Sequence, residues 1–286
     1  MVLNKQIIYV SGLPRSGSTL LCQLLGHHPD IYSIGHSSPL APLLEKIRDF
    51  TTESPFLLSQ LDVDFDLVYN RMLNGYRGYI NGWFDETDQM FVVDKNRHWV
   101  NMIETLNIID PNFKMLVCLR DLVDVFGSIE SQHQKTQLLR FPDSTSPNLH
   151  YSRLESLFKE DAVIGAPLKG IQNLQYITDE NLKDRICYIE FDALIKKPVD
   201  VMKSIYQWLD IPNFAFDPND LEVKPHETDS YYRFKYRHNT YPTINPPTKH
   251  IVSDIIKNDI YQQYTWYYKT FFPERYEAFT RNGKWT

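Results

Sequence analysis

The sequence feature that most constrains the fold is the segment Gly12–Thr19, which reads Gly-Leu-Pro-Arg-Ser-Gly-Ser-Thr. It follows the short apolar run Ile7–Ser11 and opens the segment Thr19–His27, whose leucines recur at helical spacing. A glycine-containing turn between a strand and a helix directs backbone N–H groups and the positive end of the helix dipole toward an anion. The order strand, loop and helix therefore predicts a phosphate-binding loop rather than a simple capped turn.

The loop lacks the lysine of a nucleoside-triphosphate loop. In the pattern G-x-x-x-x-G-K-[ST], lysine would stand where this chain has Ser18. The cation is instead Arg15, inside the loop, and hydroxyl donors are present on Ser16, Ser18 and Thr19. Because a planar guanidinium suits a bidentate grip on one phosphate or sulfate group, the loop fits such a group better than a polyphosphate chain.

Three further apolar runs have the β-former content of strands buried on both faces of a parallel sheet. They are Met90–Asp94, Met115–Leu119 and Ile186–Phe191. Helical patterns follow them at Val100–Ile108, Val123–Gln134 and Val199–Leu209. Strands that alternate with helices predict an α/β fold, here a P-loop-type, doubly wound parallel sheet flanked by helices.

Long helical and loop insertions interrupt this alternation. They are a helical stretch around Phe65–Phe84, a polar loop from Lys135 to Asn148 and the segment Pro212–Lys249, which is long enough to cover a ligand. A closing helix is expected over Ile251–Phe272. No internal repeat or linker divides the chain, so we expect a single domain over residues 1–286.

Composition excludes several classes of protein. A chain of 286 residues with 42% apolar residues can bury a large core, and no apolar run approaches the roughly 18 residues of a membrane helix. A formal charge of −6 argues against a nucleic-acid partner and requires any anion site to be local. The three cysteines are an odd and sparse set, and we expect a cytoplasmic protein.

A second candidate anion site lies between Arg120 and Ser128. Arg120 follows a predicted strand, at the sheet edge where open α/β folds bind ligands. Ser128 stands eight residues later, about two helical turns on, and is preceded by the small Gly127. Alone this pattern is also compatible with an arginine that pairs with an ion or caps a helix.

The two sites together resemble the sulfotransferases that use 3′-phosphoadenosine 5′-phosphosulfate (PAPS). The resemblance rests on Arg15 in a lysine-free loop and on the pattern R-D-x-x-D-V-x-x-S that begins at Arg120. It continues at Asp94-Lys95 and at residues 189–198, where Phe191 replaces the family's usual tyrosine. It covers residues 6 to 210 and is greatest to the bacterial and tyrosylprotein branches.

This resemblance implies roles for particular residues. The 5′ end of PAPS would be held by Arg15, Ser16, Gly17, Ser18 and Thr19, and the 3′-phosphate by Arg120 and Ser128. Lys95 and Arg15 are the candidates for stabilising the leaving phosphate, which departs as adenosine 3′,5′-bisphosphate (PAP). No residue pattern calls for a metal, since calcium-loop and zinc-ligand spacings are incomplete.

The sequence does not single out one residue as the general base. The tyrosylprotein branch has a glutamate soon after the loop helix, and His36 stands at the matching place in a segment one residue longer. Histidine is a suitable base at neutral pH. Asp94, His98 and His226 are alternatives, as is the absence of any base.

The C-terminal third carries a local basic segment around Arg233–His238, in which cationic and aromatic residues alternate. By the family resemblance, Lys235 and Arg237 are assigned to closing the nucleotide site, with a solvated face as the alternative. Nearby tyrosines (Tyr231, Tyr232 and Tyr241) are available to stack on the adenine or the acceptor.

The resulting hypothesis is sulfuryl transfer from PAPS to an acceptor hydroxyl or amine. The acceptor is a small molecule, glycan, lipid or peptide, and residues 50–85, 135–150 and 212–249 are expected to form its pocket. One rival is a P-loop kinase of a small metabolite, against which the missing lysine at position 18 argues. The other is a binding protein that has kept the nucleotide site but lost the base.

Overall fold

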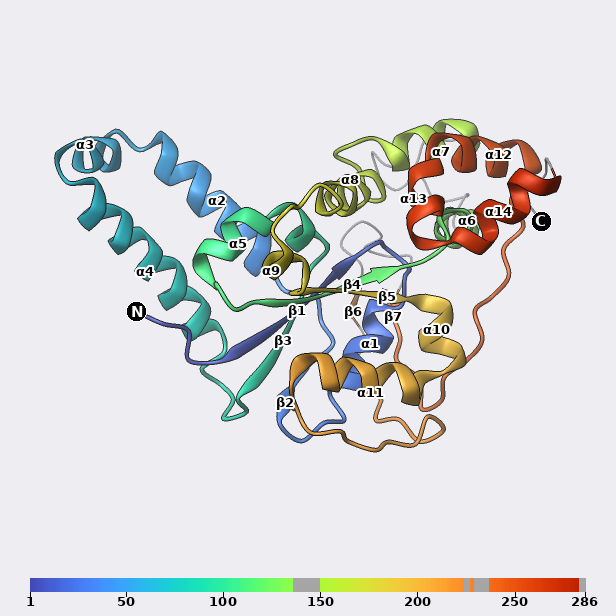
Figure 1. The fold of residues 1–286 in the computed structure, drawn as a ribbon, viewed down its shortest axis with the longest axis horizontal. Coiled ribbons are helices and arrows are strands. Elements are labelled where there is room, and N and C mark those ends of the chain that lie inside the picture. The colour runs from blue at the N-terminus through green and yellow to red at the C-terminus, as the bar shows by residue number, and fades with distance from the viewer. Residues whose placement is uncertain (136–149, 224–226, 229–236, 283–286) are drawn as a thin grey trace.

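The computed structural model describes residues 1–135, 150–223, 227–228 and 237–282 (Figure 1). Its centre is a five-stranded parallel sheet in the order β2-β3-β1-β4-β5. The strands are β1 (Gln6–Gly12), β2 (Ile31–Tyr32), β3 (Phe91–Lys95), β4 (Lys114–Leu119) and β5 (Ile186–Glu190). Helices cover both faces, which confirms the predicted α/β architecture.

Successive residues of the central strands enter two different cores. Ile7 and Tyr9 of β1 pack on one face of the sheet, and Ile8 and Val10 pack on the other. The first core also holds residues from the helices above the sheet in Figure 1, and the second holds residues from the helices below it. Because side chains alternate along a strand, a strand buried on both faces is apolar at consecutive positions, as the sequence predicted.

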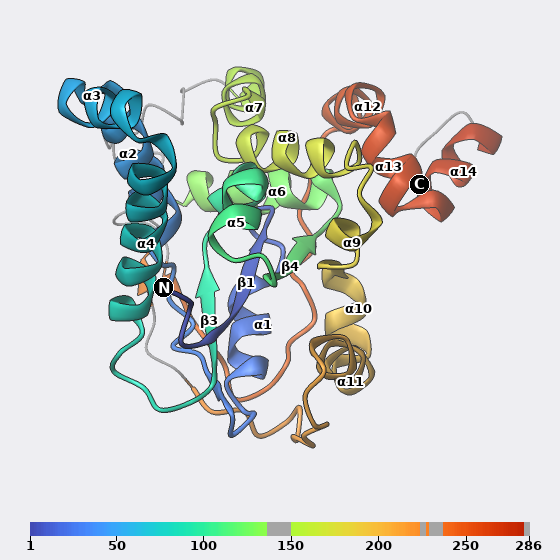
Figure 2. The same ribbon diagram turned by 60° about the vertical axis from the view of Figure 1, so that its left-hand side comes forward.

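The helices divide between the two faces and a projecting arm (Figure 2). Below the sheet lie α1 (Ser18–Leu25), α10 (Phe191–Lys196) and α11 (Pro198–Leu209). Above it are the 3₁₀ helix η1 (Arg97–Asn101), α5 (Ile103–Ile109), α6 (Leu122–Gln134), α7 (His150–Phe158), α8 (Gly165–Leu174), α12 (Asp254–Gln263) and α13 (Thr265–Phe271). The remaining elements are α9 (Glu180–Lys183), α14 (Pro273–Asn282) and the antiparallel pair β6 (Glu227–Thr228) and β7 (Arg237–His238).

The arm consists of α2 (Leu40–Glu53), α3 (Pro55–Val63) and α4 (Phe65–Trp83). The last of these confirms the helical insert that was expected around Phe65–Phe84. α3 lies at the tip of the arm and buries none of its residues. Ser54 and Asp64 cap α3 and α4, so side-chain caps define the two ends of the tip.

Three predicted elements have different bounds in the structure. The helix expected over Val100–Ile108 is η1 followed by α5, because Asn96 caps a tight turn that begins at Arg97. The strand expected to reach Phe191 ends one residue earlier, and Phe191 opens α10. The single closing helix expected over Ile251–Phe272 begins only after the cap residue Ser253 and is interrupted at Tyr264.

Candidate functional site

The phosphate loop is held tightly between β4 and α10. At Gly12 the backbone has φ of +117°, and a Cβ there would lie 2.2 Å from the carbonyl oxygen of Cys118. The next amide, that of Leu13, donates to this same oxygen at 3.0 Å. At Gly17, where φ is +86°, a Cβ would lie 2.5 Å from the ring of Phe191. Both glycines are therefore required by close approach as well as by their positive φ.

Inside the loop, Ser16 and Arg15 shape the backbone. The buried hydroxyl of Ser16 donates to the carbonyl oxygen of Leu13 at 2.5 Å, so Ser16 closes the loop on itself. Arg15 has φ of +59°, in the left-handed region that non-glycine residues seldom adopt. In the described part of the chain no side chain caps α1, whose first-turn N–H groups face the loop. The loop is thus built to receive an anion at the start of α1.

Arg15, Ser128 and Arg120 form a cluster on the other side of the loop. Arg15 Nε donates to Ser128 Oγ at 3.1 Å, and Arg120 donates from one terminal nitrogen to the carbonyl oxygen of Arg15 at 2.9 Å. The Arg120 guanidinium lies 4.4 Å from the ring centre of Phe191. The structure therefore brings together Arg15, Arg120 and Ser128.

Arg120 is a buried cation that the described residues do not fully satisfy. Its side chain is 6% exposed, and its Nε has no hydrogen-bond partner among the residues that the structure describes. Burial lowers the pKa of Arg120, and the neighbouring Arg15 lowers it further, while Asp124 acts in the opposite direction. Two guanidinium groups held this close together favour a bound anion.

The C-terminal helices hold the backbone around Arg120 in place. The Tyr267 hydroxyl donates to the carbonyl oxygen of Arg120 at 3.0 Å. The Tyr268 hydroxyl accepts from the amide of Leu122 at 3.1 Å. Both tyrosines are fully buried in α13. The position of Arg120 thus depends on a helix about 150 residues further along the chain.

Asp121 connects the same segment to α14. Its carboxylate caps α6 by accepting from the amides of Val123 and Asp124, and it pairs with Arg275. The Tyr261 hydroxyl donates to its second oxygen at 3.3 Å. Burial raises the pKa of Asp121, and Arg275 opposes that rise. The carboxylate of Asp121 therefore has a structural task, which is to fix the segment that carries Arg120.

Lys95 lies on the opposite side of the loop from Arg120. It ends β3, is 6% exposed, and donates from Nζ to the carbonyl oxygen of Gly35 at 2.6 Å and to Thr19 Oγ1 at 3.4 Å. The parallel register places Lys95 beside Val10 of β1. Its ammonium is thereby positioned at the start of α1, where the loop would receive an anion.

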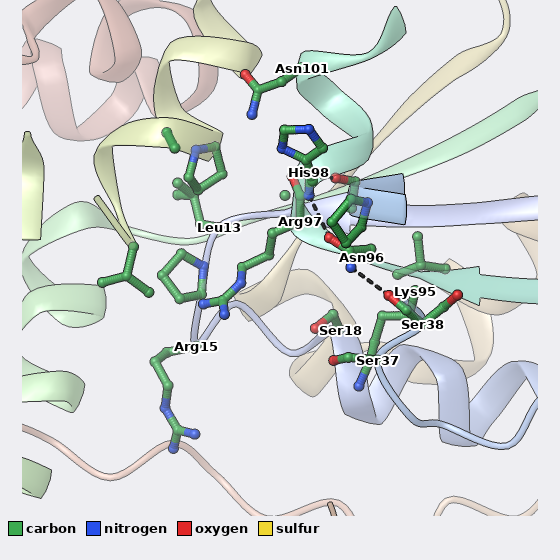
Figure 3. Close-up of a pocket in the computed structure, with 18 of the residues that line it drawn as sticks. Leu13, Arg15, Ser18, Ser37, Ser38, Lys95, Asn96, Arg97, His98 and Asn101 are labelled. Atoms are coloured by element: carbon green, nitrogen blue, oxygen red, sulfur yellow. Dashed lines mark hydrogen bonds between the residues drawn. The ribbon is translucent and has the colours of Figure 1, made fainter. Parts of the chain in front are cut away.

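A cavity of about 530 Å³ opens beside the phosphate loop (Figure 3). Arg15, Ser18, Thr19 and Lys95 line it, and no aspartate or glutamate does so within the described part of the chain. The other polar lining residues come from the segment after β2 and from η1: Ser37, Ser38, Asn96, Arg97, His98 and Asn101. Its far wall is apolar and belongs to the α8 region.

The structure places His98, and not His36, on this cavity. His98 lies 3.0 Å, Nε2 to Oε2, from Glu45 of α2. His36 lines a separate cavity of about 490 Å³ together with Tyr32 and Gln89. Asp94 is fully buried, accepts from Trp99 Nε1 at 2.6 Å, and lines neither of these two cavities.

The structure does not describe the side chains of the C-terminal basic residues Lys235 and Arg237. Lys235 and His226 lie among the residues that the structure does not describe, as do Tyr231 and Tyr232. Arg237 is placed only as backbone, in β7. Among the described residues no group of three or more histidine, cysteine, aspartate or glutamate side chains is arranged to hold a metal. No helix in the described ranges has the length and apolar character to cross a membrane.

The chain matches a known protein family. A family model described as "Sulfotransferase family" matches residues 7–215. This chain belongs to the sulfotransferase family. A protein of Aquifex aeolicus described as uncharacterized is 29% identical over 136 residues, which are 46% of this chain and 17% of that protein. The chain thus spans about a sixth of the length of that curated relative.

Solved sulfotransferase structures resemble the chain at low identity. The sulfotransferase domain from the curacin biosynthetic pathway is 17% identical with a TM-score of 0.49, and the match covers 93% of this chain and 99% of that one. A sulfotransferase from Mycobacterium avium is 16% identical with a TM-score of 0.48, covering 95% and 78%. Retinol dehydratase, solved with androsterone and inactive cofactor PAP, is 14% identical with a TM-score of 0.39, covering 74% and 61%.

Some residues of the sulfotransferase site were not apparent from sequence. Glu45 lies 53 positions before His98 in an insert, and no motif links the two. The tyrosines of α13 were assigned only to the closing helix expected over Ile251–Phe272. His98 had a usable signal, because it follows Lys95 by three residues at the carboxyl end of a strand, where α/β sheets bind ligands.

Proposed function

We propose that this sulfotransferase moves a sulfuryl group from PAPS to an acceptor hydroxyl or amine and releases PAP. The observation that carries the proposal is the arrangement around Arg120: it donates to the carbonyl oxygen of Arg15, whose side chain donates to Ser128, and its own buried Nε has no hydrogen-bond partner among the described residues. A phosphate at this place would neutralise both cations and accept from that nitrogen. Membership of the family supports PAPS as the donor.

The two ends of the nucleotide are assigned to two sides of the loop. Arg15, Arg120 and Ser128 would bind the 3′-phosphate, since Arg15 contacts Ser128 through its side chain and Arg120 through its carbonyl oxygen. The 5′-phosphosulfate would lie at the start of α1, where backbone N–H groups of the loop, Ser18, Thr19 and Lys95 are within reach. Ser16 is assigned to the shape of the loop, because its hydroxyl is committed to Leu13.

The transfer itself needs positioning and charge stabilisation. An acceptor oxygen or nitrogen attacks sulfur as the bond from sulfur to the bridging phosphate oxygen breaks, and the electron pair of that bond stays on the phosphate. Lys95 is the cation that would stabilise the negative charge developing on the bridging oxygen. Its contacts with Gly35 and Thr19 hold the ammonium ready for this role.

His98 is the general base that the cavity favours. It lines the cavity together with Lys95, and Glu45 faces its Nε2 at 3.0 Å. A carboxylate this close to Nε2 restricts the orientation of the imidazole, and Nδ1 is assigned to take the acceptor's proton. His36, which lines the other cavity, is assigned no part in the proton transfer.

Kinetics of single variants test this assignment. We expect His98→Gln to lower kcat by about 10²- to 10⁴-fold, the usual contribution of a general base, while the Kd for PAP stays within twofold of the wild type. Turnover is measured as release of PAP from PAPS in the presence of a panel of phenols, sugars and amines. Glu45→Gln should lower kcat by a smaller factor.

His36→Gln is the matched control, because it removes the same chemical group from the neighbouring cavity. We expect its kcat to equal that of the wild type. If His36→Gln loses turnover while His98→Gln keeps it, the base has been assigned to the wrong cavity.

A further inference from the structure

His250, in the segment before α12, packs next to the Arg15–Arg120–Ser128 cluster through Gly127. The contact occurs at Gly127 of α6, immediately before Ser128. A Cβ on Gly127 would lie 2.7 Å from the Cβ of His250 and 3.0 Å from Cγ2 of the buried Val252. Because glycine stands at position 127, this segment packs directly against the helix, and the half-buried His250 is fixed beside the cluster.

Positive charges from three elements act on the imidazole of His250. They are Arg120 at the end of β4, Arg15 in the phosphate loop and Lys135 at the C-terminal end of α6. Partial burial lowers the pKa of His250, and each of these cations lowers it further. A histidine surrounded in this way is uncharged at neutral pH until an anion enters the cluster.

Resting on the proposed function, we propose that His250 is a further ligand of the 3′-phosphate and that it takes up a proton from solvent when that phosphate binds. The phosphate dianion would neutralise Arg15 and Arg120 and attract a positive charge on the ring. The imidazolium N–H would then donate to a phosphate oxygen. Apart from the transfer of this proton from solvent to the ring, no covalent bond forms or breaks.

This role makes nucleotide binding depend on pH. The free protein holds the ring neutral and the bound state holds it protonated, so binding consumes a proton. The affinity gained from His250 is then greatest below the pKa of the ring in the free protein and is lost as the pH rises through the higher pKa of the bound state. Adenosine 5′-phosphate (AMP), which lacks the 3′-phosphate, should show no such component.

Titration calorimetry with PAP and AMP on the wild type and on His250→Gln tests the proposal. We expect the variant to bind PAP about tenfold more weakly at pH 7, the usual effect of losing one charge-assisted hydrogen bond, and to bind AMP like the wild type. Titrations in two buffers of different ionisation enthalpy count the protons. The wild type should take up more protons with PAP than His250→Gln does, and the two should agree with AMP.

Two further variants distinguish the effect of the imidazole ring from the effects of a neighbouring charge and of the packing at Gly127. Lys249→Gln removes the adjacent exposed cation and should leave the ratio of PAP to AMP affinity unchanged. Gly127→Ala keeps the imidazole but forces the segment away from α6, so it should lower PAP affinity as His250→Gln does. Thermal denaturation confirms that each variant is folded before it is titrated.

Several results would overturn the proposal. Equal PAP affinity and equal proton uptake in the wild type and His250→Gln would do so. So would an unchanged PAP affinity in Gly127→Ala, or an equal loss in Lys249→Gln, which would indicate a general effect of charge. A wild-type protein that binds PAP no better than AMP would instead refute the 3′-phosphate site, and with it the proposed function.

Discussion

At the scale of single residues, the candidate site contains positively charged side chains that are buried from solvent. Arg120 is buried beside another arginine, and Lys95 is buried at the end of a strand. Burying a charge without full pairing destabilises a protein by several kcal/mol. Lys95 lines a cavity to which the described residues contribute no carboxylate, a setting that suits an anion.

Asp94 is a buried acidic residue, and its burial should make the free energy of unfolding depend on pH. Burial raises the pKa of its carboxyl from 3.8 to about 6. Between these values the folded state binds more protons than the unfolded state, so wild-type stability falls as the pH rises. Asp94→Asn keeps an oxygen for Trp99 Nε1 and removes the charge, so its stability relative to the wild type should rise by about 3 kcal/mol between pH 4 and pH 7.5.

Chemical denaturation across this pH range measures the effect. The control is Asp49→Asn, which removes an aspartate from a partly exposed position on α2. Its stability relative to the wild type should change little with pH. A pH-independent difference for Asp94→Asn would mean that the Asp94 carboxylate is well solvated or paired in the folded protein.

The residues proposed to bind an anion could be chosen from the sequence, whereas their packing partners could not. The loop and the Arg120/Ser128 pair follow strands at the carboxyl edge of the sheet, so local pattern and topology are enough to find them. The base could not be chosen in the same way, because His36 and His98 both follow strands. The contact with Glu45 and the separation of the two cavities depend on tertiary packing.

At the scale of elements, the buried strands were predictable because both of their faces are covered, which makes the sequence apolar throughout. The two-residue strand β2 carries too short a pattern to detect. The break at Tyr264 between α12 and α13 was missed because apolar and aromatic residues continue through it. That break matters, since α13 presents Tyr267 and Tyr268 to the segment at Arg120.

The C-terminal helices should therefore influence nucleotide binding without touching the nucleotide. Arg275→Met leaves the buried Asp121 carboxylate without its cation, and we expect a loss of about 1–3 kcal/mol in the free energy of unfolding. The segment that carries Arg120 would loosen, so PAP affinity should fall several-fold. Arg275→Lys keeps the charge and should restore most of both properties.

Denaturation and calorimetry on the two Arg275 variants check this expectation. The unpaired Asp121 is more harmful when ionised, so the destabilisation by Arg275→Met should be larger at pH 8 than at pH 5. A variant that is destabilised but binds PAP like the wild type would show that α14 contributes to stability alone.

At the scale of the whole molecule, cationic side chains gather at the cavity although the chain as a whole is acidic. The chain carries a net charge of −6, yet Arg15, Lys95 and Arg97 line a cavity to which no described aspartate or glutamate contributes. The projecting arm takes part in the same site, because its first helix supplies Glu45 to His98. An insert that lies outside the basic α/β pattern thus provides part of the proposed chemistry.

The most direct test of the central claim compares PAP with ATP–Mg in a thermal-denaturation titration of the wild type and Arg120→Met. At about 100 times its Kd, PAP should stabilise the wild type by about 2.7 kcal/mol, and this gain should be lost in Arg120→Met. ATP–Mg should give no comparable stabilisation of either protein. Stabilisation by ATP–Mg but not by PAP would contradict the account and indicate a kinase.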